Sequence, residues 1–186
     1  MRKCKVCKST FKPTMPIQAV CGDYDCAIAH GRETRAKAAR VALRRRREGL
    51  RSKSDWLKLA QTEFNKFIRL RDESMNLPCI SCGRYHQGQW HAGHYRPVGG
   101  SSGSALRFNE INCHRQCSVC NNFKSGSLTD YRINLIKKIG LPLIEWLEKD
   151  HPKPAKWSIE EIQAIRKYYQ HAHKELSASR EHSEQF

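Results

Sequence analysis

Cysteine pairs are the most distinctive chemical feature of this sequence. The four pairs are Cys4 with Cys7, Cys21 with Cys26, Cys79 with Cys82, and Cys117 with Cys120. A Cys-x-x-Cys pair supplies two thiolates to one metal ion, and a second pair brought round by a loop completes a closed tetrahedral zinc site. We therefore expect about two structural zinc ions per chain, because four thiolates leave no position for a reacting water. The ninth cysteine, Cys113, is unpaired in this scheme and should tolerate replacement by Ser.

The segment between the two later pairs holds the candidate reaction centre. It contains HAGHYRP at residues 91–97 and Asn112, and Asn121 directly follows Cys120. Hydrolysis of a phosphodiester needs a base that is neutral near pH 7, for which one imidazole is suited, and a divalent metal that binds the phosphate. A histidine of this segment can be that base, and the amide oxygen of Asn121 is a hard donor compatible with magnesium or manganese. Asn112 is expected to orient the loop that carries His94.

Each of these residues also has a plainer interpretation. Asn121 can be only the N-cap of a helix. The histidines can be structural or spare zinc ligands, an alternative with more weight at His91 and His114 than at His94.

The order of these motifs resembles two groups of nucleases. A Cys-x-x-Cys pair, His94, Asn112 and Cys-x-x-Cys-Asn-x-x-Lys together resemble the HNH, or ββα-metal, nucleases, in the variant of endonuclease VII of T-even phages, where Asn replaces the final His. HAGHYRP, LRFNEIN, QCSVCN and the N-terminal CKVC resemble the NinG/Rap family of lambdoid phages, from Cys4 to about Trp146. The resemblance implies a zinc-stabilised ββα-metal core that cleaves D-loops and Holliday junctions during phage recombination. It assigns His94 as the general base and Asn121 to the position of the metal-binding final His. Composition and spacing alone reach only a metal-dependent nuclease.

One position departs from the HNH pattern. The family usually has Asp directly before the catalytic His, whereas this chain has Gly93, which has no side chain to bind a metal. His91 is the best local substitute and is therefore included among the catalytic residues. His114 and Glu110 stand behind it, and the choice among the three stays open at this point.

The chain is strongly basic. Its 186 residues include 34 Lys and Arg against 18 Asp and Glu, which gives a formal net charge of +16. Such a surplus favours a polyanionic partner. Half of it lies in residues 31–53, where a merely solvated helix would intersperse both signs of charge. Phosphate contacts, with salt-dependent affinity, are expected from Arg40, Arg44, Arg45, Arg46, Arg47 and Lys124.

These residues require a scaffold, which we expect to be a small zinc-stabilised α+β fold. We divide it into a zinc-ribbon-like module at 1–30, a basic helical arm at 31–53, an HNH-like nuclease core with flanking helices at 54–150, and a C-terminal helix with a polar tail at 151–186. The arm should be helical from Gly31 to Gly49. A second helix should begin at Ser54 and run to about Leu70, with Leu57, Ala60, Phe64 and Phe67 or Ile68 at core positions.

The later elements follow from turn and cap signals. Residues 79–100 alternate loosely, as in a short hairpin. One helix should run from Cys120 to about Ile139 and stop at Gly140, and the next should begin with Pro142 and turn Leu143, Ile144, Trp146 and Leu147 inward. The capping box at Ser158 predicts a last helix, which should fray after Leu176.

We therefore expect a metal-dependent, structure-specific DNA endonuclease that hydrolyses branched recombination intermediates. The alternative is a non-catalytic, zinc-stabilised regulator that binds DNA or RNA. Branched DNA is the main expected partner, and a second copy of the chain and host or phage recombination proteins are further candidates. The charged N-terminus has no apolar stretch like that of a signal peptide, so we expect no membrane association and a location in the cytoplasm of the bacterial host.

Overall fold

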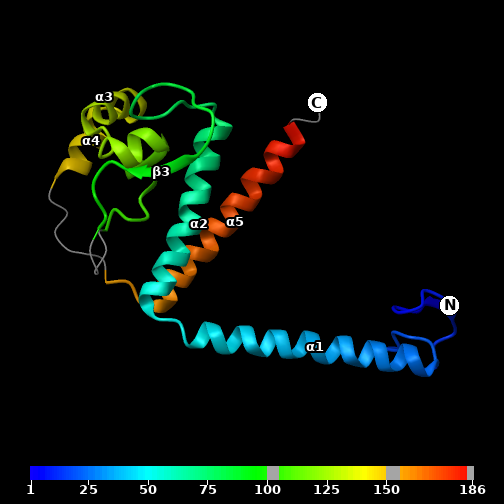
Figure 1. The fold of residues 1–186 in the computed structure, drawn as a ribbon. Helices are drawn as coiled ribbons and strands as arrows, with labels where there is room; N and C mark the ends of the chain where they lie inside the picture. Colours follow the sequence, from blue (N-terminus) through cyan, green and yellow to red (C-terminus); the bar gives the residue numbers. More distant parts are fainter. Residues whose placement is uncertain (100–104, 150–155, 184–186) are drawn as a thin grey trace. The chain divides into compact units, whose positions relative to one another are not determined.

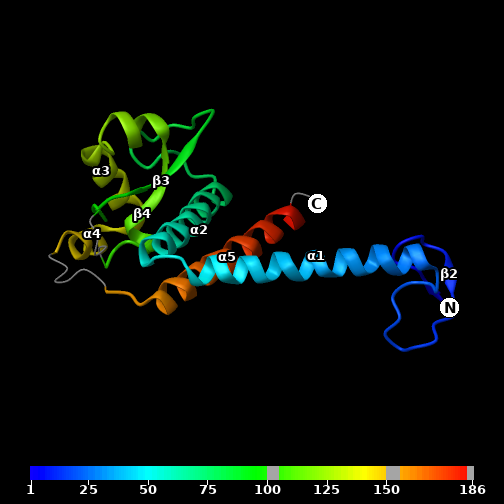
Figure 2. The same ribbon diagram turned by 60° about the horizontal axis from the view of Figure 1, so that its bottom comes forward.

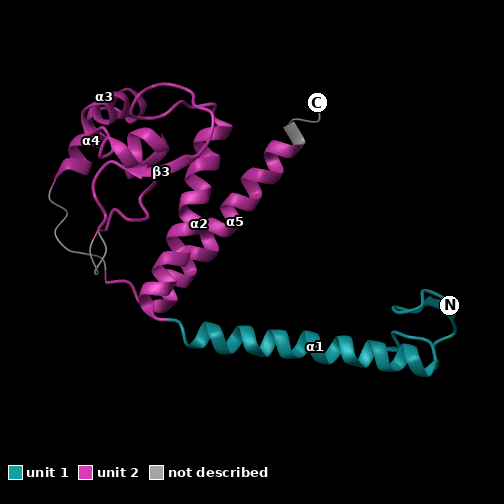
Figure 3. Cartoon of the chain, in the orientation of Figure 1, with its two compact units in different colours: residues 1–51 teal, residues 52–186 magenta. Residues whose placement is uncertain are grey.

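The chain divides into two compact units, residues 1–51 and 52–186, which are coloured teal and magenta in Figure 3. The computed structural model describes residues 1–99, 105–149 and 156–183. The expected domain boundary at residue 150 therefore lies outside the described residues. Among the helices described, none is long and apolar enough to cross a membrane. The chain has the α+β composition expected from the sequence, with several helices and two small sheets.

The first unit consists of a small strand pair and one long helix. Strands β1 (Arg2–Lys3) and β2 (Thr10–Phe11) pair antiparallel, and helix α1 spans Tyr24–Gly49. This helix begins before the expected start at Gly31, because the Asp23 carboxylate caps it by accepting the Cys26 N–H at 3.0 Å. Cys26 is the only buried residue within α1, so most of the helix surface is exposed.

Helices α2 (Lys53–Ser74) and α5 (Ile159–Ser183) pack along each other in the second unit (Figures 1 and 2). The apolar stripe of α2 is confirmed, since Ala60, Phe64 and Ile68 are completely buried. The cap of α2 is Ser52 rather than Ser54, and it forms a capping box with Asp55.

Helix α5 starts at the predicted capping box. The Ser158 N–H donates to the Glu161 carboxylate at 2.6 Å, and the Glu161 N–H donates to Ser158 Oγ at 3.2 Å. The prediction that the chain frays after Leu176 is wrong, because α5 continues to Ser183.

The central sheet is a strand pair with a long connection. Strand β3 (Trp90–His94) pairs antiparallel with β4 (Cys113–Cys117), which follows the short 3-10 helix η1 (Glu110–Asn112). The predicted hairpin within 79–100 is therefore wrong. The first half of that range instead forms a tight turn, in which the Gly83 N–H donates to the Cys79 carbonyl at 2.8 Å.

Residues that follow β4 form two helical pieces rather than one. The π-helix η2 spans Val119–Phe123, and α3 spans Leu128–Ile139. The single helix predicted from Cys120 is wrong, because Ser125, Gly126 and Ser127 all have positive φ and interrupt it.

Helix α4 (Leu141–Glu148) begins one residue before the predicted start and has Pro142 in its first turn. Ile144 and Leu147 are fully buried. Leu143 and Trp146, which were also expected to point inward, are 41% and 42% exposed, so the apolar stripe of this short helix is narrower than its sequence indicates.

Cys113 is completely buried in an apolar cluster with Phe64, Ile68 and Tyr169. It lies outside both cysteine clusters, as expected. Its expected tolerance of Ser does not fit this burial, because a hydroxyl placed there without a partner costs about 1–3 kcal/mol.

Candidate functional site

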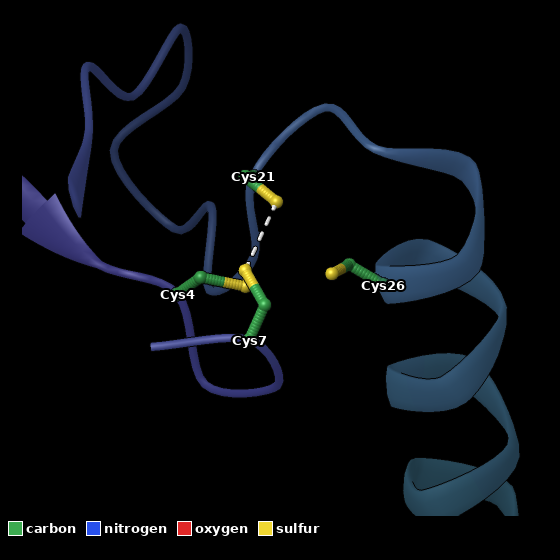
Figure 4. Close-up of side chains that lie close together, drawn as sticks. All are labelled: Cys4, Cys7, Cys21 and Cys26. Atoms are coloured by element: carbon green, nitrogen blue, oxygen red, sulfur yellow. Dashed lines mark hydrogen bonds between the residues drawn. The ribbon is translucent and has the colours of Figure 1, made fainter. Parts of the chain in front are cut away.

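The first four cysteines converge on one point in the first unit (Figure 4). Cys4, Cys7 and Cys21 come from loops and Cys26 from the first turn of α1, and their Sγ atoms all lie within 4.8 Å of one another. Burial opposes ionisation of Cys4, but the backbone N–H groups around it outweigh burial and lower its pKa to about 6. This cluster can hold a zinc ion.

The second four cysteines form an equivalent cluster beside the central sheet. Cys79 and Cys82 lie in the tight turn, Cys117 ends β4, and Cys120 lies in η2, with all four Sγ atoms within 4.8 Å of one another. Burial and the neighbouring sulfurs raise the pKa of Cys120, so four thiolates here require a cation among them. Both predicted clusters can therefore bind zinc.

A histidine that the sequence analysis did not single out lies beside the second cluster. His86 Nε2 is 3.0 Å from Cys82 Sγ. Its position four residues after Cys82 is the only sequence signal that could have indicated this contact.

His94 is the last residue of β3 and is half-buried. Its Nε2 lies 3.0 Å from the Arg107 carbonyl oxygen. Because a carbonyl only accepts, Nε2 carries the proton and the lone pair of the neutral ring is on Nδ1. The ring stacks on Phe64 of α2 at a centroid distance of 6.0 Å. Burial lowers the pKa of His94, so its imidazole is neutral at pH 7 and can accept a proton at Nδ1.

Asn112 holds the backbone that follows His94. Its Oδ1 accepts the Arg96 N–H at 2.8 Å, and its Nδ2 donates to the carbonyls of Arg96 and Leu106 at 3.1 and 3.3 Å. Its own carbonyl accepts the Tyr95 N–H at 2.8 Å. Since Asn112 is fully buried and both ends of its amide bind backbone, it acts on the position of His94 rather than on a substrate.

Two amide side chains converge on Gly93. A Cβ atom at this position would lie 2.0 Å from Gln116 Oε1 and 3.2 Å from Asn121 Oδ1. The orientation of the Gln116 amide is fixed, because its Nε2 donates to Ser81 Oγ and to the Gly126 carbonyl, both at 2.6 Å. Sequence reasoning missed Gln116, because its contact with Gly93 runs diagonally across the strand pair, in which the register places Gln116 opposite His91 and His114 opposite Gly93.

His91 lies on the same face of the sheet as Gly93, directly opposite Gln116 in the register. Its Nε2 is buried and has no hydrogen-bond partner within the part of the chain that the structure describes. Asn121 lies inside η2, whose N-cap is Ser118, so the interpretation of Asn121 as a cap is wrong. Its Nδ2 donates to Asn122 Oδ1 at 2.9 Å.

His94 and Asn121 point to different faces of the sheet. The His94 ring stacks on α2, whereas Asn121 lies beside Gly93, and neighbouring strand residues point to opposite faces. No hydrogen bond joins the two side chains in the described segments. A substrate that contacts both must therefore reach them around the end of β3.

His114 is held in a buried polar network. Its Nε2 donates to the Ile111 carbonyl at 3.1 Å, which leaves Nδ1 to accept from Lys138 Nζ at 2.8 Å and Arg71 Nη2 at 3.1 Å. Burial lowers its pKa, so it stays neutral. Glu110 is also engaged, with Arg71 Nη1 at 3.5 Å from its Oε2. Three residues were candidates to replace the missing Asp: His91, His114 and Glu110. Within the described residues, His91 alone among them has a side-chain nitrogen without a hydrogen-bond partner, whereas His114 and Glu110 are engaged by other side chains.

Asp72 is the anionic centre of that network. It accepts from Lys138 Nζ at 2.9 Å, from Arg71 Nε at 3.0 Å and from the Arg115 N–H at 2.7 Å. Burial alone would raise the pKa of Asp72, but the charges of Arg71 and Lys138 and the hydrogen bond from the Arg115 N–H outweigh burial and hold it well below its usual range. The network therefore fixes β4 to α2 and α3.

Basic residues predicted to contact DNA are exposed in both units. Arg40 and Arg44–Arg47 are exposed on α1, where Arg44 and Glu48 form a loose 3.9 Å ion pair. Lys124 is exposed at the end of η2 and lines a pocket of about 450 Å³ beside the second cysteine cluster.

Comparisons with known proteins agree over nearly the whole chain. Residues 1–180 match the family described as NinG, the bacteriophage lambda NinG protein. The chain is 39% identical to protein ninG of Escherichia phage 933W over 196 residues, which cover 96% of this chain and 95% of that protein. It is also 39% identical, over 199 residues and with the same coverage, to protein ninG of Salmonella phage P22 and of Escherichia phage lambda. No solved structure matches. The chain belongs to the NinG family of bacteriophage proteins.

Proposed function

We propose that this protein is a metal-dependent endonuclease that hydrolyses phosphodiesters in branched DNA. The observation that carries the proposal is the state of His94, whose neutral ring keeps a lone pair on Nδ1 at the end of β3 that lies away from the second cysteine cluster. A strand pair followed by a short helix, with an Asn directly after the last cysteine, supports the likeness to the HNH nucleases.

In this proposal His94 removes a proton from water. Its Nδ1 accepts the proton while Nε2–H remains on the Arg107 carbonyl, which keeps the ring oriented as its charge changes. Asn112 fixes the adjoining backbone. A zinc ion bound by all four thiolates of a cysteine cluster would have no open position for water. Both cysteine clusters would therefore stabilise the fold rather than take part in the reaction.

Magnesium or manganese would be held by amide oxygens on the other face of the strand. Asn121 Oδ1 and Gln116 Oε1 both point to Gly93, and the unpartnered His91 Nε2 lies on the same face. Oxygen donors suit these hard cations. When bound, the cation would supply positive charge to the scissile phosphate. Because none of the three residues is a carboxylate, binding should be weak until the DNA phosphate adds its own oxygens.

The choice of branched DNA rests on the motifs that the chain shares with the NinG/Rap nucleases, and the exposed arginines of α1 support a DNA partner more generally. Lys124, exposed after η2, is assigned to the same role.

A second candidate function is a zinc-stabilised regulator that binds nucleic acid without cutting it. The observation that favours it is the Gly93 site, where a buried glutamine amide lies over the position at which the HNH pattern has a carboxylate. A protein with this site and no measurable metal-dependent cleavage would be such a regulator.

Cleavage of labelled DNA decides between the two. The substrates are a four-way junction, a D-loop, a flap and a linear duplex of matched sequence, each incubated with magnesium, manganese or EDTA. We expect metal-dependent cutting of the branched substrates and a loss of roughly 10²-fold or more in His94→Ala. The matched control is His171→Ala, because His171 is exposed on α5 and pairs only with Glu175 within the described chain. Binding without cleavage by the wild-type protein would instead establish the regulator.

A further inference from the structure

A polar groove runs along one side of α2 near His94. It has a volume of about 440 Å³ and is lined by α2 residues at helical spacing, among them Lys58, Gln61 and Asn65, with Arg107 closing it from the loop before η1. The other lining residues, Ser54, Leu57 and Thr62, are uncharged. The groove therefore contains two cations and no carboxylate.

Arg107 is only partly satisfied by the protein. Its Nη1 donates to Gln61 Oε1 at 3.3 Å and its Nη2 to the Val98 carbonyl at 2.6 Å, whereas its Nε is buried without a partner. Among the residues described, no Asp or Glu pairs with this guanidinium. A partly buried cation without a counter-charge is expensive, and burial lowers its pKa accordingly. An anion in the groove would relieve that imbalance.

The same residue connects the groove to the proposed base. The Arg107 carbonyl oxygen lies 3.0 Å from His94 Nε2, while its side chain lines the groove. His94 also stacks on Phe64, which directly precedes Asn65 on α2. A chain of phosphates lying in the groove would thus lead toward the end of β3, where His94 is.

The geometry points to this groove as a subsite for a backbone phosphate of the nucleic-acid strand that the proposed nuclease cuts, with Arg107 and Lys58 as its cationic contacts. This inference rests on the proposed function for the identity of the strand. The groove is large enough for a phosphate with its sugar, and because it is elongated and open to solvent it admits a continuous strand. Arg and Lys are the usual contacts to backbone phosphates.

Two substitutions test the groove without removing Arg107. Lys58→Gln removes one exposed charge. Gln61→Glu places a carboxylate where Arg107 Nη1 already donates, so it should occupy the guanidinium. It removes the 2.8 Å donation from Gln61 Nε2 to Asn65 Oδ1, and a turn of the Asn65 amide, which would let Asn65 Nδ2 donate to the new carboxylate, should keep the fold stable. The matched control is Gln170→Glu on α5, which makes the same charge change outside the groove lining.

The measurement is the binding of the full-length protein to labelled junction DNA without magnesium or manganese, followed by fluorescence anisotropy over a range of salt concentrations. We expect Lys58→Gln and Gln61→Glu each to lower the salt slope by about one and Gln170→Glu to leave it unchanged, because each phosphate contact releases about one counterion. Thermal unfolding should show no loss of stability in Gln61→Glu.

Unchanged slopes in both groove variants, or an equal loss in the control, would overturn the subsite. The result does not depend on cleavage. If the wild-type protein cuts no DNA in magnesium, the nuclease proposal fails while a lowered slope still supports a phosphate-binding groove. If it cuts DNA and both slopes are unchanged, only the subsite fails.

Discussion

Replacing Gly93 by Ala tests the packing of the candidate metal site most directly. The backbone at Gly93 is not in the positive-φ region, so an L residue is allowed there. The obstacle is Gln116, whose Oε1 would be 2.0 Å from the new Cβ. Gln116 must therefore move, and it is 1% exposed with both Nε2 hydrogen bonds directed at fixed partners.

The expected loss of stability follows from those two bonds. Each hydrogen bond contributes about 0.5–1.5 kcal/mol, and a buried amide left unsatisfied costs about 1–3 kcal/mol. Gly93→Ala should thus destabilise the protein by roughly 2–4 kcal/mol. In a Gln116→Ala background the space is vacated, and the same change should cost about zero, since Ala loses less backbone entropy than Gly.

Urea unfolding of the wild-type protein, the two single variants and the double variant measures the coupling. We expect the two substitutions to be non-additive by roughly 2–4 kcal/mol, the whole cost of Gly93→Ala in the wild-type background. Additivity within about 0.5 kcal/mol would show that Gln116 does not lie over Gly93, and the site described above would be wrong.

The same pair of positions tests the metal. Gly93→Asp combined with Gln116→Ala restores a carboxylate beside Asn121 Oδ1, so manganese should bind more tightly in isothermal titration calorimetry, by about tenfold or more. The matched control is Gln116→Ala alone. Equal affinity in both proteins would remove Asn121 from the metal site.

Three further outcomes follow from the site and its supports. Elemental analysis should find about two zinc ions per chain; Cys117→Ser should lose one of them together with the fold of the second unit, whereas Cys113→Ser should keep both and lose only about 1–3 kcal/mol of stability. Because burial lowers the pKa of His94, the rate of single-turnover cleavage should rise with pH to a midpoint below about 6.5 and then level off, and a midpoint above pH 7 would contradict a buried neutral base. Asp72→Asn should lower the free energy of unfolding in urea by about 3–5 kcal/mol because it leaves buried cations unpaired, while the neighbouring surface change Glu73→Gln should lower it by less than about 1 kcal/mol. Since the pKa of Asp72 is lowered in the folded state, the stability that its carboxylate contributes is complete above about pH 4 and is lost on acidification. The Asp72→Asn variant should not show this loss.

Local signals predicted much of the architecture. The cysteine spacing predicted which thiols gather in each cluster, because each pair is a local chelate. The buried face of α2 and the cap of α5 were likewise predictable from spacing and cap residues. The partner of β3 was not, because β4 follows a long connection and strand pairing depends on tertiary packing rather than on nearby residues.

The contents of the candidate site depended on that missed pairing. Gln116 is one polar residue among several before Cys117, and its place over Gly93 depends on the pairing of β3 with β4 and on the direction of its side chain, since the register sets it opposite His91. The groove beside α2 was also invisible, since Arg107 is far from Lys58 in sequence and only the fold brings them to one groove. The sequence left His114 open between a structural histidine, a spare zinc ligand and a substitute for the missing Asp, because its buried partners Asp72 and Lys138 come from α2 and α3, far away in sequence.

The position of Cys26 in the first turn of α1 has a consequence for how that helix forms. A helix is slow and unfavourable to nucleate, because its first turn fixes several residues for a single hydrogen bond. Here the first turn is capped by Asp23 and carries a thiol of a cluster that can hold zinc, so zinc uptake would supply the nucleus from which the exposed, Ala- and Arg-rich remainder can propagate. Chelation of zinc should therefore lower the helical signal of α1 in circular dichroism. The arginines of α1 would then be held less rigidly, although none of them binds the metal.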